Sequence, residues 1–536
     1  MQINQLSDRG RRPQAGDYFV TDDGTNTRKT DFTQLAQAVI GDYAGNTING
    51  KQQTPKAAIE ENAAAIAALQ DNVVVNARRY TARWNKSSAK LTRLNDAAGI
   101  TTTTTNFGHF GSVNSNYNNP FDNIYPWSGI RLCNIDIDRY TALAAGDSLL
   151  DCVKAWEGDP DFSYTDESGV WRYTPEFWGK SWDDGTYRYF EVADREIGGY
   201  VHYRATIEGR WHGRNVTLTV GGTEKTVLVP SVGMPAKRIT MSTLHTYAKN
   251  YGATLDNIFT VDGSLLLAIV EYANMDMQAA IGQGVASLYR ESSDKIQSAA
   301  SNSNIVEILS ANAATVIPGA IFDIGTANGG NQVGSFIVES VASSGTITSV
   351  TLNEAVTVTT DHFWSVHGLV NKADESIGSK SGYIGTNGRA NAYYRGAVMF
   401  GNLWFYILGA YRQSGTQKVW IAANEADADA ADALDTAKHL DTGIVLAGSN
   451  GYVQTLGMLS RSGLLSIPPF CTAIGGSSAA PVGDYHYINT SAGNTVLICG
   501  GSANHGASDG PLSGYWNSTA SYSGWVSGAR PALKSP

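Results

Sequence analysis

Apolar residues between positions 55 and 75 recur at alternating spacings of three and four, with Ala at many flanking positions. This spacing is typical of the a/d seam of a coiled coil and predicts an oligomerising helix over 51–78. The seam positions are Ile59, Asn62, Ile66, Leu69 and Val73. Two to three heptads are too short to be stable alone, so neighbouring domains must support them. We expect a homotrimer; the alternative is one amphipathic helix packed on its own chain.

Other elements follow from the same kind of pattern. Tyr187-Arg-Tyr189 and the segment 200–203 alternate like half-buried strands. Apolar residues at helical spacing predict helices over 242–250 and 263–280. The segment 301–365 is rich in Val, Ile, Thr, Gly and Ser and almost free of Lys and Arg, which predicts a small all-β insertion.

These patterns divide the chain into five parts and predict an α+β fold. The parts are a polar segment (1–50), the helix (51–78), a linker (79–119), a head built from 120–300 and 366–536, and the all-β insertion (301–365).

Composition narrows the function classes. Of 536 residues, 42% are hydrophobic and 16% charged, which indicates folded domains, and the net charge of −10 includes no basic stripe. Nucleic acid is therefore disfavoured as a partner. No apolar run reaches the length of a membrane span, so we expect no membrane insertion. No secretory leader is recognisable, so we expect a protein that folds in a cytoplasm. The four cysteines form no CxxC pair, which favours free buried thiols over a zinc site.

An ordered set of motifs runs through the two head segments. In chain order they are Pro120-Phe-Asp-Asn-Ile-Tyr-Pro-Trp127, Phe177-Trp178, Tyr187-Arg-Tyr189, Glu271-Tyr-Ala-Asn274, Gln278-Ala-Ala-Ile-Gly-Gln-Gly284, Tyr394-Arg-Gly396, Gly401-Asn-Leu-Trp-Phe-Tyr406, Gly500-Gly501 and Gly528-Ala-Arg-Pro-Ala-Leu533. Together they resemble the C-type-lectin-like fold of bacteriophage tail proteins. The set is also similar to the variable proteins of diversity-generating retroelements, of the major tropism determinant type, and to the formylglycine-generating, sulfatase-modifying family.

The resemblance implies a non-catalytic receptor-binding protein of a phage tail fibre or tail tip, without a cofactor. Its expected partners are a host cell-surface receptor (protein or glycan), its own copies, and other tail or baseplate proteins, which the 1–50 segment would contact as a virion-attachment segment. The expected location is the virion, assembled in the host cytoplasm. Three rivals remain: a structural tail or baseplate protein, an enzyme that degrades surface polysaccharide, and a bacterial display protein.

The segment 500–529 has the composition of an antibody paratope. It contains Ser, Gly, Asn, Tyr and Trp, one Asp, and no Lys, Arg or Glu before position 530. In the variable proteins the corresponding segment faces the ligand, and retroelement diversification of it is a hypothesis. The resemblance thus assigns ligand binding to Asn504, His505, Ser508, Asp509, Tyr515, Trp516, Asn517, Ser521, Tyr522 and Trp525. For the two Trp residues, packing inside the irregular half of the fold is an equal alternative.

Other chemistry finds little support. Formylglycine-generating enzymes use a Cys pair near the C-terminus, where this chain has only Cys499, and calcium-dependent lectin motifs are absent. Asp427-Ala-Asp429-Ala-Ala-Asp432 lacks the Gly and Glu of an EF-hand, so we expect a solvated acidic loop. His362 and His367 have no evident third metal ligand. Arg530 is either a surface residue or ties the chain end to carbonyls or a carboxylate.

Overall fold

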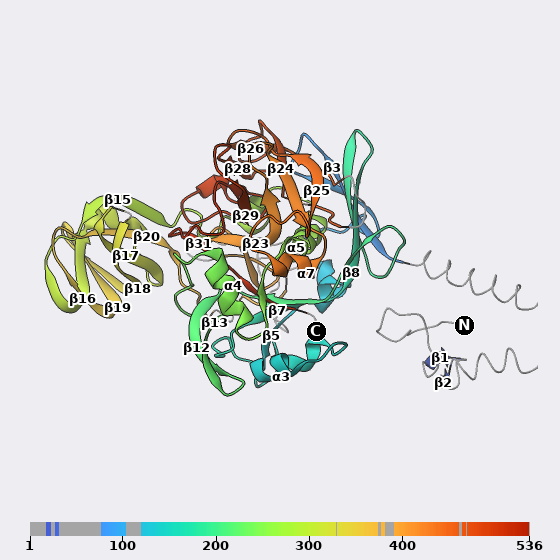
Figure 1. The fold of residues 1–536 in the computed structure, drawn as a ribbon, viewed down its shortest axis with the longest axis horizontal. Coiled ribbons are helices and arrows are strands. Elements are labelled where there is room, and N and C mark those ends of the chain that lie inside the picture. Colours follow the sequence, from blue (N-terminus) through green and yellow to red (C-terminus); the bar gives the residue numbers. More distant parts are fainter. Residues whose placement is uncertain are drawn as a thin grey trace, which may run out of the picture. The chain divides into compact units, whose positions relative to one another are not determined.

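The chain divides into two units in the computed structural model, which describes residues 18–22, 27–31, 77–102, 119–328, 330–373, 377–380, 391–459, 464–467 and 469–534 (Figure 1). In the first unit (1–78 with 195–198), β1 (Tyr18–Asp22) and β2 (Thr27–Asp31) form an antiparallel hairpin. The oligomerising helix predicted over 51–78 lies outside the described residues except at 77 and 78, as does most of 1–50. All that follows concerns the second unit.

A five-stranded antiparallel sheet includes part of the segment that was predicted to be a linker, so that part of the prediction is wrong. Its order is β10-β8-β9-β3-β4, and two of its strands lie within 79–119. In β3, the apolar residues Tyr80, Ala82 and Trp84 alternate with polar ones and are buried, and the polar Thr81 between them is buried as well. This period of two in the sequence is typical of a strand. The strands are β3 (Arg79–Asn85), β4 (Leu91–Asn95), β8 (Phe177–Asp183), β9 (Tyr187–Ala193) and β10 (Val201–Tyr203).

A six-stranded sheet joins the two ends of the head. Its order is β14-β32-β11-β7-β5-β6, so the C-terminal strand lies between strands that precede the insertion. Arg530 leads into that strand and is buried; its Nε donates to Asp256 at 2.6 Å and its Nη1 to the Val398 carbonyl at 2.7 Å. The tethering role is therefore confirmed over the surface alternative. The strands are β5 (Arg131–Ile135), β6 (Val153–Trp156), β7 (Trp171–Thr174), β11 (Thr206–Gly209), β14 (Thr254–Leu255) and β32 (Pro531–Leu533).

The helices differ from the predicted ones at their ends. A capping box at Asn257 starts α5 earlier than expected, and Ala273 ends it in the left-handed conformation (φ 48°). The predicted helix over 263–280 is therefore two helices, because Asp276 caps a new one. The helices are α3 (Ile137–Ala142), α4 (Met241–Lys249), α5 (Ile258–Tyr272), α6 (Met277–Ile281) and α7 (Glu425–Ala430), with 3-10 turns η2 (Pro120–Asn123), η3 (Trp127–Gly129), η4 (Leu149–Cys152), η5 (Ser310–Thr315) and η6 (Gly506–Ser508).

The C-terminal half of the head forms a nine-stranded sheet with the central order β25-β24-β23-β29-β30-β28-β26-β27, and β31 pairs with β23. Every residue of β23 is buried, so the sheet is covered on both faces at its centre. Its strands are β23 (Trp404–Arg412), β24 (Lys418–Ala422), β25 (His439–Val445), β26 (Gly451–Leu456), β27 (Cys471–Ile474), β28 (Tyr485–Ile488), β29 (Thr495–Cys499), β30 (Gly514–Trp516) and β31 (Ser527–Gly528). Two hairpins complete the head: β12 (Arg214–Val220) with β13 (Thr223–Val229), and β21 (Ala392–Tyr394) with β22 (Ala397–Phe400).

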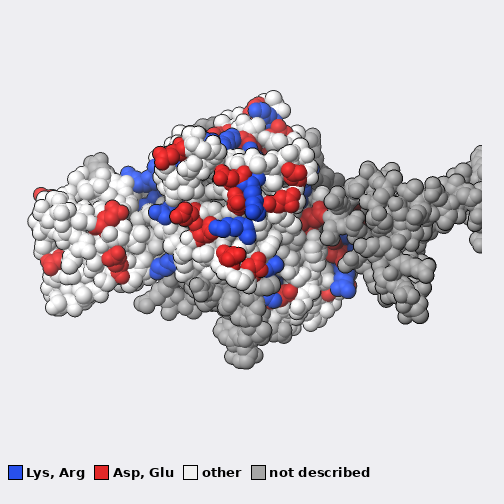
Figure 2. Space-filling view, turned by 90° about the horizontal axis from the view of Figure 1, so that it is seen from below, with Lys and Arg blue, Asp and Glu red and all other residues white. Residues whose placement is uncertain are grey.

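The insertion is a six-stranded antiparallel sheet, β15-β20-β17-β18-β19-β16, with its own hydrophobic core around the stacked rings of Phe322 and Trp364. It includes the predicted 301–365 segment and extends beyond it at both ends. It forms the lobe at the left of Figure 1, and few charged side chains mark its surface in Figure 2. The strands are β15 (Tyr289–Lys295), β16 (Ala300–Leu309), β17 (Ala320–Ala327), β18 (Gly330–Ser344), β19 (Ile347–Val358) and β20 (Phe363–Leu369).

Two buried ion pairs made by one arginine link three of the motifs. Arg395 donates to both oxygens of Glu271, at 2.7 and 2.8 Å, and to Asp122 at 2.9 Å. The Tyr394 hydroxyl also donates to Glu271, at 2.9 Å. Such a bidentate pair fixes both the position and the orientation of its partners. The motif residues therefore fasten helix α5 and the hairpin β21-β22 to the start of the head.

The observed class is thus mixed α+β, as predicted, and strands predominate in it. None of the helices in the described part of the chain is long and apolar enough to cross a membrane.

Candidate functional site

Two short strands present tyrosines on one face of the nine-stranded sheet. In β28, Tyr485 and Tyr487 are half-buried, whereas the residues that alternate with them are buried. In β30, Tyr515 is half-buried between buried neighbours. The strands pair in parallel with Tyr487 beside Tyr515, so all three rings lie on the same face.

These rings and two neighbours form a continuous tyrosine cluster, which we define as Tyr452, Tyr485, Tyr487, His505 and Tyr515. Ring centroids lie 5.0 Å apart for Tyr452–Tyr485, 4.6 Å for Tyr485–Tyr487, 5.0 Å for Tyr487–His505 and 5.9 Å for Tyr487–Tyr515. Contacts at these separations hold aromatic rings in place.

The cluster rests on a buried base. The Trp404 side chain is 3% exposed, and its ring lies 5.2 Å from His505 and 5.3 Å from Tyr515. Trp404 belongs to the Gly-Asn-Leu-Trp motif, so the motif supports the face that carries the cluster. The central strand of this sheet is buried along its whole length, so the face lies over a packed core.

A polar rim borders the cluster. The Ser508 and Tyr452 hydroxyls lie 3.3 Å apart. The Asn504 side chain is exposed, and the buried Ser502 hydroxyl beneath it lies 2.5 Å from its oxygen and 2.9 Å from Nδ1 of His505. Hydroxyl and amide groups beside aromatic faces suit both sugars and peptides.

Burial affects the charge of two members of the cluster. Burial lowers the pKa of His505 to about 4, so its ring carries no charge there. Burial also raises the pKa of Tyr487 above its usual range, so its hydroxyl stays protonated. The site therefore offers aromatic faces and neutral hydrogen-bonding groups rather than charge.

Known proteins give no direct guide to this surface. No protein-family model matches the chain, and no curated protein is detectably similar to it. The case for a function therefore rests on the site's geometry and on the motifs.

The structure separates the ten predicted ligand-binding residues by exposure. Asn504, Ser521 and Tyr522 are exposed; His505, Ser508, Tyr515, Asn517 and Trp525 are half-buried; Asp509 and Trp516 are fully buried. The last two assignments are wrong as contact residues, because a side chain without exposed surface cannot touch a ligand in this conformation. Trp516 alternates with Tyr515 and so faces the core, where it packs 5.9 Å from Phe470.

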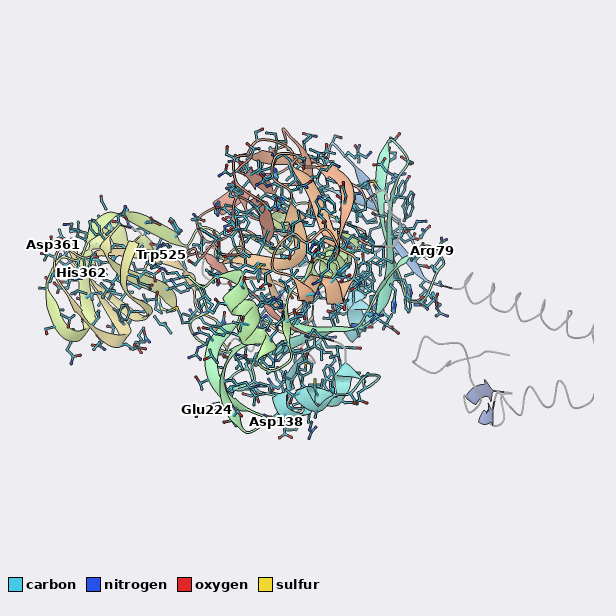
Figure 3. All side chains as sticks on the ribbon, in the orientation of Figure 1. Arg79, Asp138, Glu224, Asp361, His362 and Trp525 are labelled. Atoms are coloured by element: carbon cyan, nitrogen blue, oxygen red, sulfur yellow. The ribbon has the colours of Figure 1, made fainter. Side chains whose placement is uncertain are left out.

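Trp525 lies where the insertion meets the head (Figure 3). Its ring stacks on His367 of the insertion at 4.9 Å, and the Arg238 guanidinium lies 3.5 Å from the ring centroid. His367 also contacts the buried carboxylate of Asp323, which accepts from Lys237 at 2.6 Å. Trp525 therefore helps to hold the insertion against the head.

Sequence reasoning missed three residues of the cluster: Tyr452, Tyr485 and Tyr487. The signal for two of them was present, since Tyr485-His-Tyr487 alternates just as Tyr187-Arg-Tyr189 does. This signal was overlooked because the paratope-like composition begins at position 500, whereas β28, the strand that carries these two tyrosines, ends before that segment.

One chemical expectation needs correction. The expected acidic loop is the helix α7 and the turn after it, and its carboxylates are engaged: Nε2 of His245 lies 2.8 Å from Asp429 and Nδ1 lies 2.6 Å from Asp432. His367, for which no third metal ligand was evident beside His362, contacts Asp323. Separately, burial raises the pKa of the Cys499 thiol to about 12, so it stays protonated at neutral pH.

Proposed function

We propose that this chain is the non-catalytic receptor-binding protein of a bacteriophage tail fibre or tail tip. Its head, C-type-lectin-like in this proposal, binds a host surface ligand through the tyrosine cluster and the adjoining loop. The observation that supports this most is the cluster itself. Half-buried aromatic rings on a rigid sheet, with a neutral polar rim, are typical of recognition surfaces.

The proposal includes a homotrimer joined through 51–78 and attached to the virion through 1–50. Several weak sites on one tail would then act together, which raises avidity without new contacts. Diversification by a retroelement is a separate part of the proposal. A near-repeat of the coding sequence of 500–529, with a reverse transcriptase gene beside it, would support that part, and the lack of both would refute it.

The decisive experiment compares two matched double variants. Tyr485→Ala/Tyr487→Ala removes two rings of the cluster. Tyr187→Ala/Tyr189→Ala removes an equivalent half-buried pair from β9, in another sheet. Labelled full-length protein is applied to a panel of bacterial strains, and circular dichroism confirms that each variant is folded.

We expect the wild type and the β9 variant to bind a strain and the β28 variant to lose at least about tenfold in affinity, since central aromatic contacts each contribute about 2 kcal/mol or more. Equal binding by both variants would place the receptor site elsewhere. If no strain is bound, the structural tail protein becomes the better reading. Release of sugar from cell envelopes would instead favour the polysaccharide-degrading enzyme.

A further inference from the structure

The side chain of Asn402 bonds the head to the insertion. Asn402 is fully buried, and its amide group forms two hydrogen bonds with the backbone of Leu369 at the end of β20. Its Oδ1 accepts from the Leu369 amide at 2.9 Å, and its Nδ2 donates to the Leu369 carbonyl at 3.0 Å. A side-chain amide carries an acceptor and donors in one plane, as a peptide group does. Asn402 therefore pairs with the end of β20 as a neighbouring strand would.

The backbone of Asn402 holds the loop 500–513. The Ala503 amide donates to the Asn402 carbonyl at 3.0 Å, and three residues later the Gly506 amide donates to the Ala286 carbonyl at 2.9 Å. Positions 504 and 505, which the proposed function assigns to ligand contact, lie between these two anchored amides. The conformation of the exposed part of the loop therefore depends on both anchors.

Both anchors lead to the root of the insertion, which we define as residues 286–288 and 368–369, where the chain enters and leaves that lobe. The Gly368 amide donates to the Leu288 carbonyl at 3.2 Å, so the two halves of the root are joined. Gly368 has a positive φ of 97°, and a Cβ there would overlap Oδ1 of Asn402. The close approach of Asn402 to the root therefore requires a glycine at this position.

We propose that Asn402 is a positioning residue for ligand binding, because it fixes the loop 500–513 to the root of the insertion. The insertion is then the frame on which the loop is held. This inference rests on the proposed function, in which the loop contacts the host ligand. A loop that is ordered before binding loses less conformational entropy when the ligand binds. The alternative is that Asn402 only satisfies buried backbone groups and contributes to stability alone.

Asn371 offers a matched control at the same junction. It is also fully buried, and its Nδ2 donates to the carbonyls of His212 and Ser231, both at 2.9 Å. Asn402→Ala and Asn371→Ala therefore each remove two hydrogen bonds between a buried amide and the backbone, and both should lower Tm by several degrees. The groups bonded to Asn371 flank the hairpin β12-β13, so its loss should leave the loop in place.

Hydrogen exchange of the full-length chain, followed by mass spectrometry of peptides that cover 500–513, measures the loop without any receptor. We expect the loop of Asn402→Ala to exchange at least about tenfold faster than that of the wild type, because its anchored amides open more often. The loop of Asn371→Ala should exchange at the wild-type rate. On a strain that the wild type binds, Asn402→Ala should lose about three- to tenfold in affinity, and Asn371→Ala should bind as the wild type does.

Equal exchange of the loop in the wild type and in folded Asn402→Ala would overturn the proposal. Equal acceleration in both variants would also overturn it, since the loop would then follow stability alone. Faster exchange without a loss of affinity would refute the role of Asn402 in binding. If no strain is bound, the proposed function fails, while the exchange rates still decide whether Asn402 holds the loop. If Asn402→Ala does not fold, Asn402→Ser replaces it, because it keeps a hydroxyl group at this position, and the same outcomes apply.

Discussion

Trp516 and Tyr515 are adjacent in β30 but should respond oppositely to truncation. Trp516 is fully buried in the main core, and its indole nitrogen has no hydrogen-bond partner among the described residues, so its contribution is packing alone. Trp516→Ala should therefore destabilise the head by about 3–5 kcal/mol. Tyr515 is half-buried, so Tyr515→Ala should cost only about 1–2 kcal/mol.

Thermal unfolding measures the difference. At about 2 °C per kcal/mol, the lower end of the range for large domains, Trp516→Ala should lower Tm by about 6–10 °C and Tyr515→Ala by about 2–4 °C. Trp516→Phe is the matched control, because it keeps an aromatic ring in the core and should recover most of the loss. Receptor binding should show the reverse order, with Tyr515→Ala the more damaging. Equal shifts in Tm for the two Ala variants would refute the assignment of Trp516 to the core face.

Two further perturbations test the buried charges. Arg395→Met leaves the Glu271 carboxylate buried without its main counter-charge, so it should destabilise the head by about 3–5 kcal/mol in urea unfolding, and adding Glu271→Gln should restore part of the loss. For His245, burial lowers the pKa, but its hydrogen bonds to Asp429 and Asp432 outweigh this and raise it overall. Its stabilising effect is therefore complete below the unfolded pKa of about 6.5 and is lost as pH rises through the higher folded value. The difference in Tm between the wild type and His245→Gln should thus narrow from about pH 6 to pH 9. A constant or widening difference would contradict a stabilising interaction of protonated His245 with Asp429 and Asp432.

The spacing of apolar residues and the local composition predicted the parts of the fold that depend on neighbouring residues in the sequence. The all-β insertion and the helices predicted over 242–250 and 263–280 follow from composition and apolar spacing; their ends differ, and the second is divided into two helices. Helix ends depend on caps such as Asn257, which are weaker signals than a buried face. The linker error has a different cause. The alternation of β3 was legible in the sequence, but its partner β9 lies about a hundred residues further on, and no local pattern indicates that pairing.

The candidate site was harder to predict, because it is assembled from separate segments. Composition located the region of Asn504 and Tyr515, yet it could not distinguish a ring that faces solvent from one that faces the core. That distinction depends on the register of β30 against β28, where Tyr515 pairs with Tyr487. A one-residue change of register would have exposed Trp516 instead.

The loop 500–513 contains both exposed and buried polar residues, and composition alone does not distinguish the two kinds. Asn504 is exposed and His505 is half-exposed, whereas Asp509, a few residues later, is buried against the backbone at Gly501. Small polar side chains that face a ligand contribute little packing to their own loop. The conformation of the loop must therefore be held by other residues, and here these are the buried aromatic and acidic groups beneath the exposed positions. Asp509, the single Asp of the segment, lies buried against Gly501 and accepts a hydrogen bond from the Ser502 amide, so it helps to hold the loop. In the proposed function, recognition belongs to the exposed residues around it.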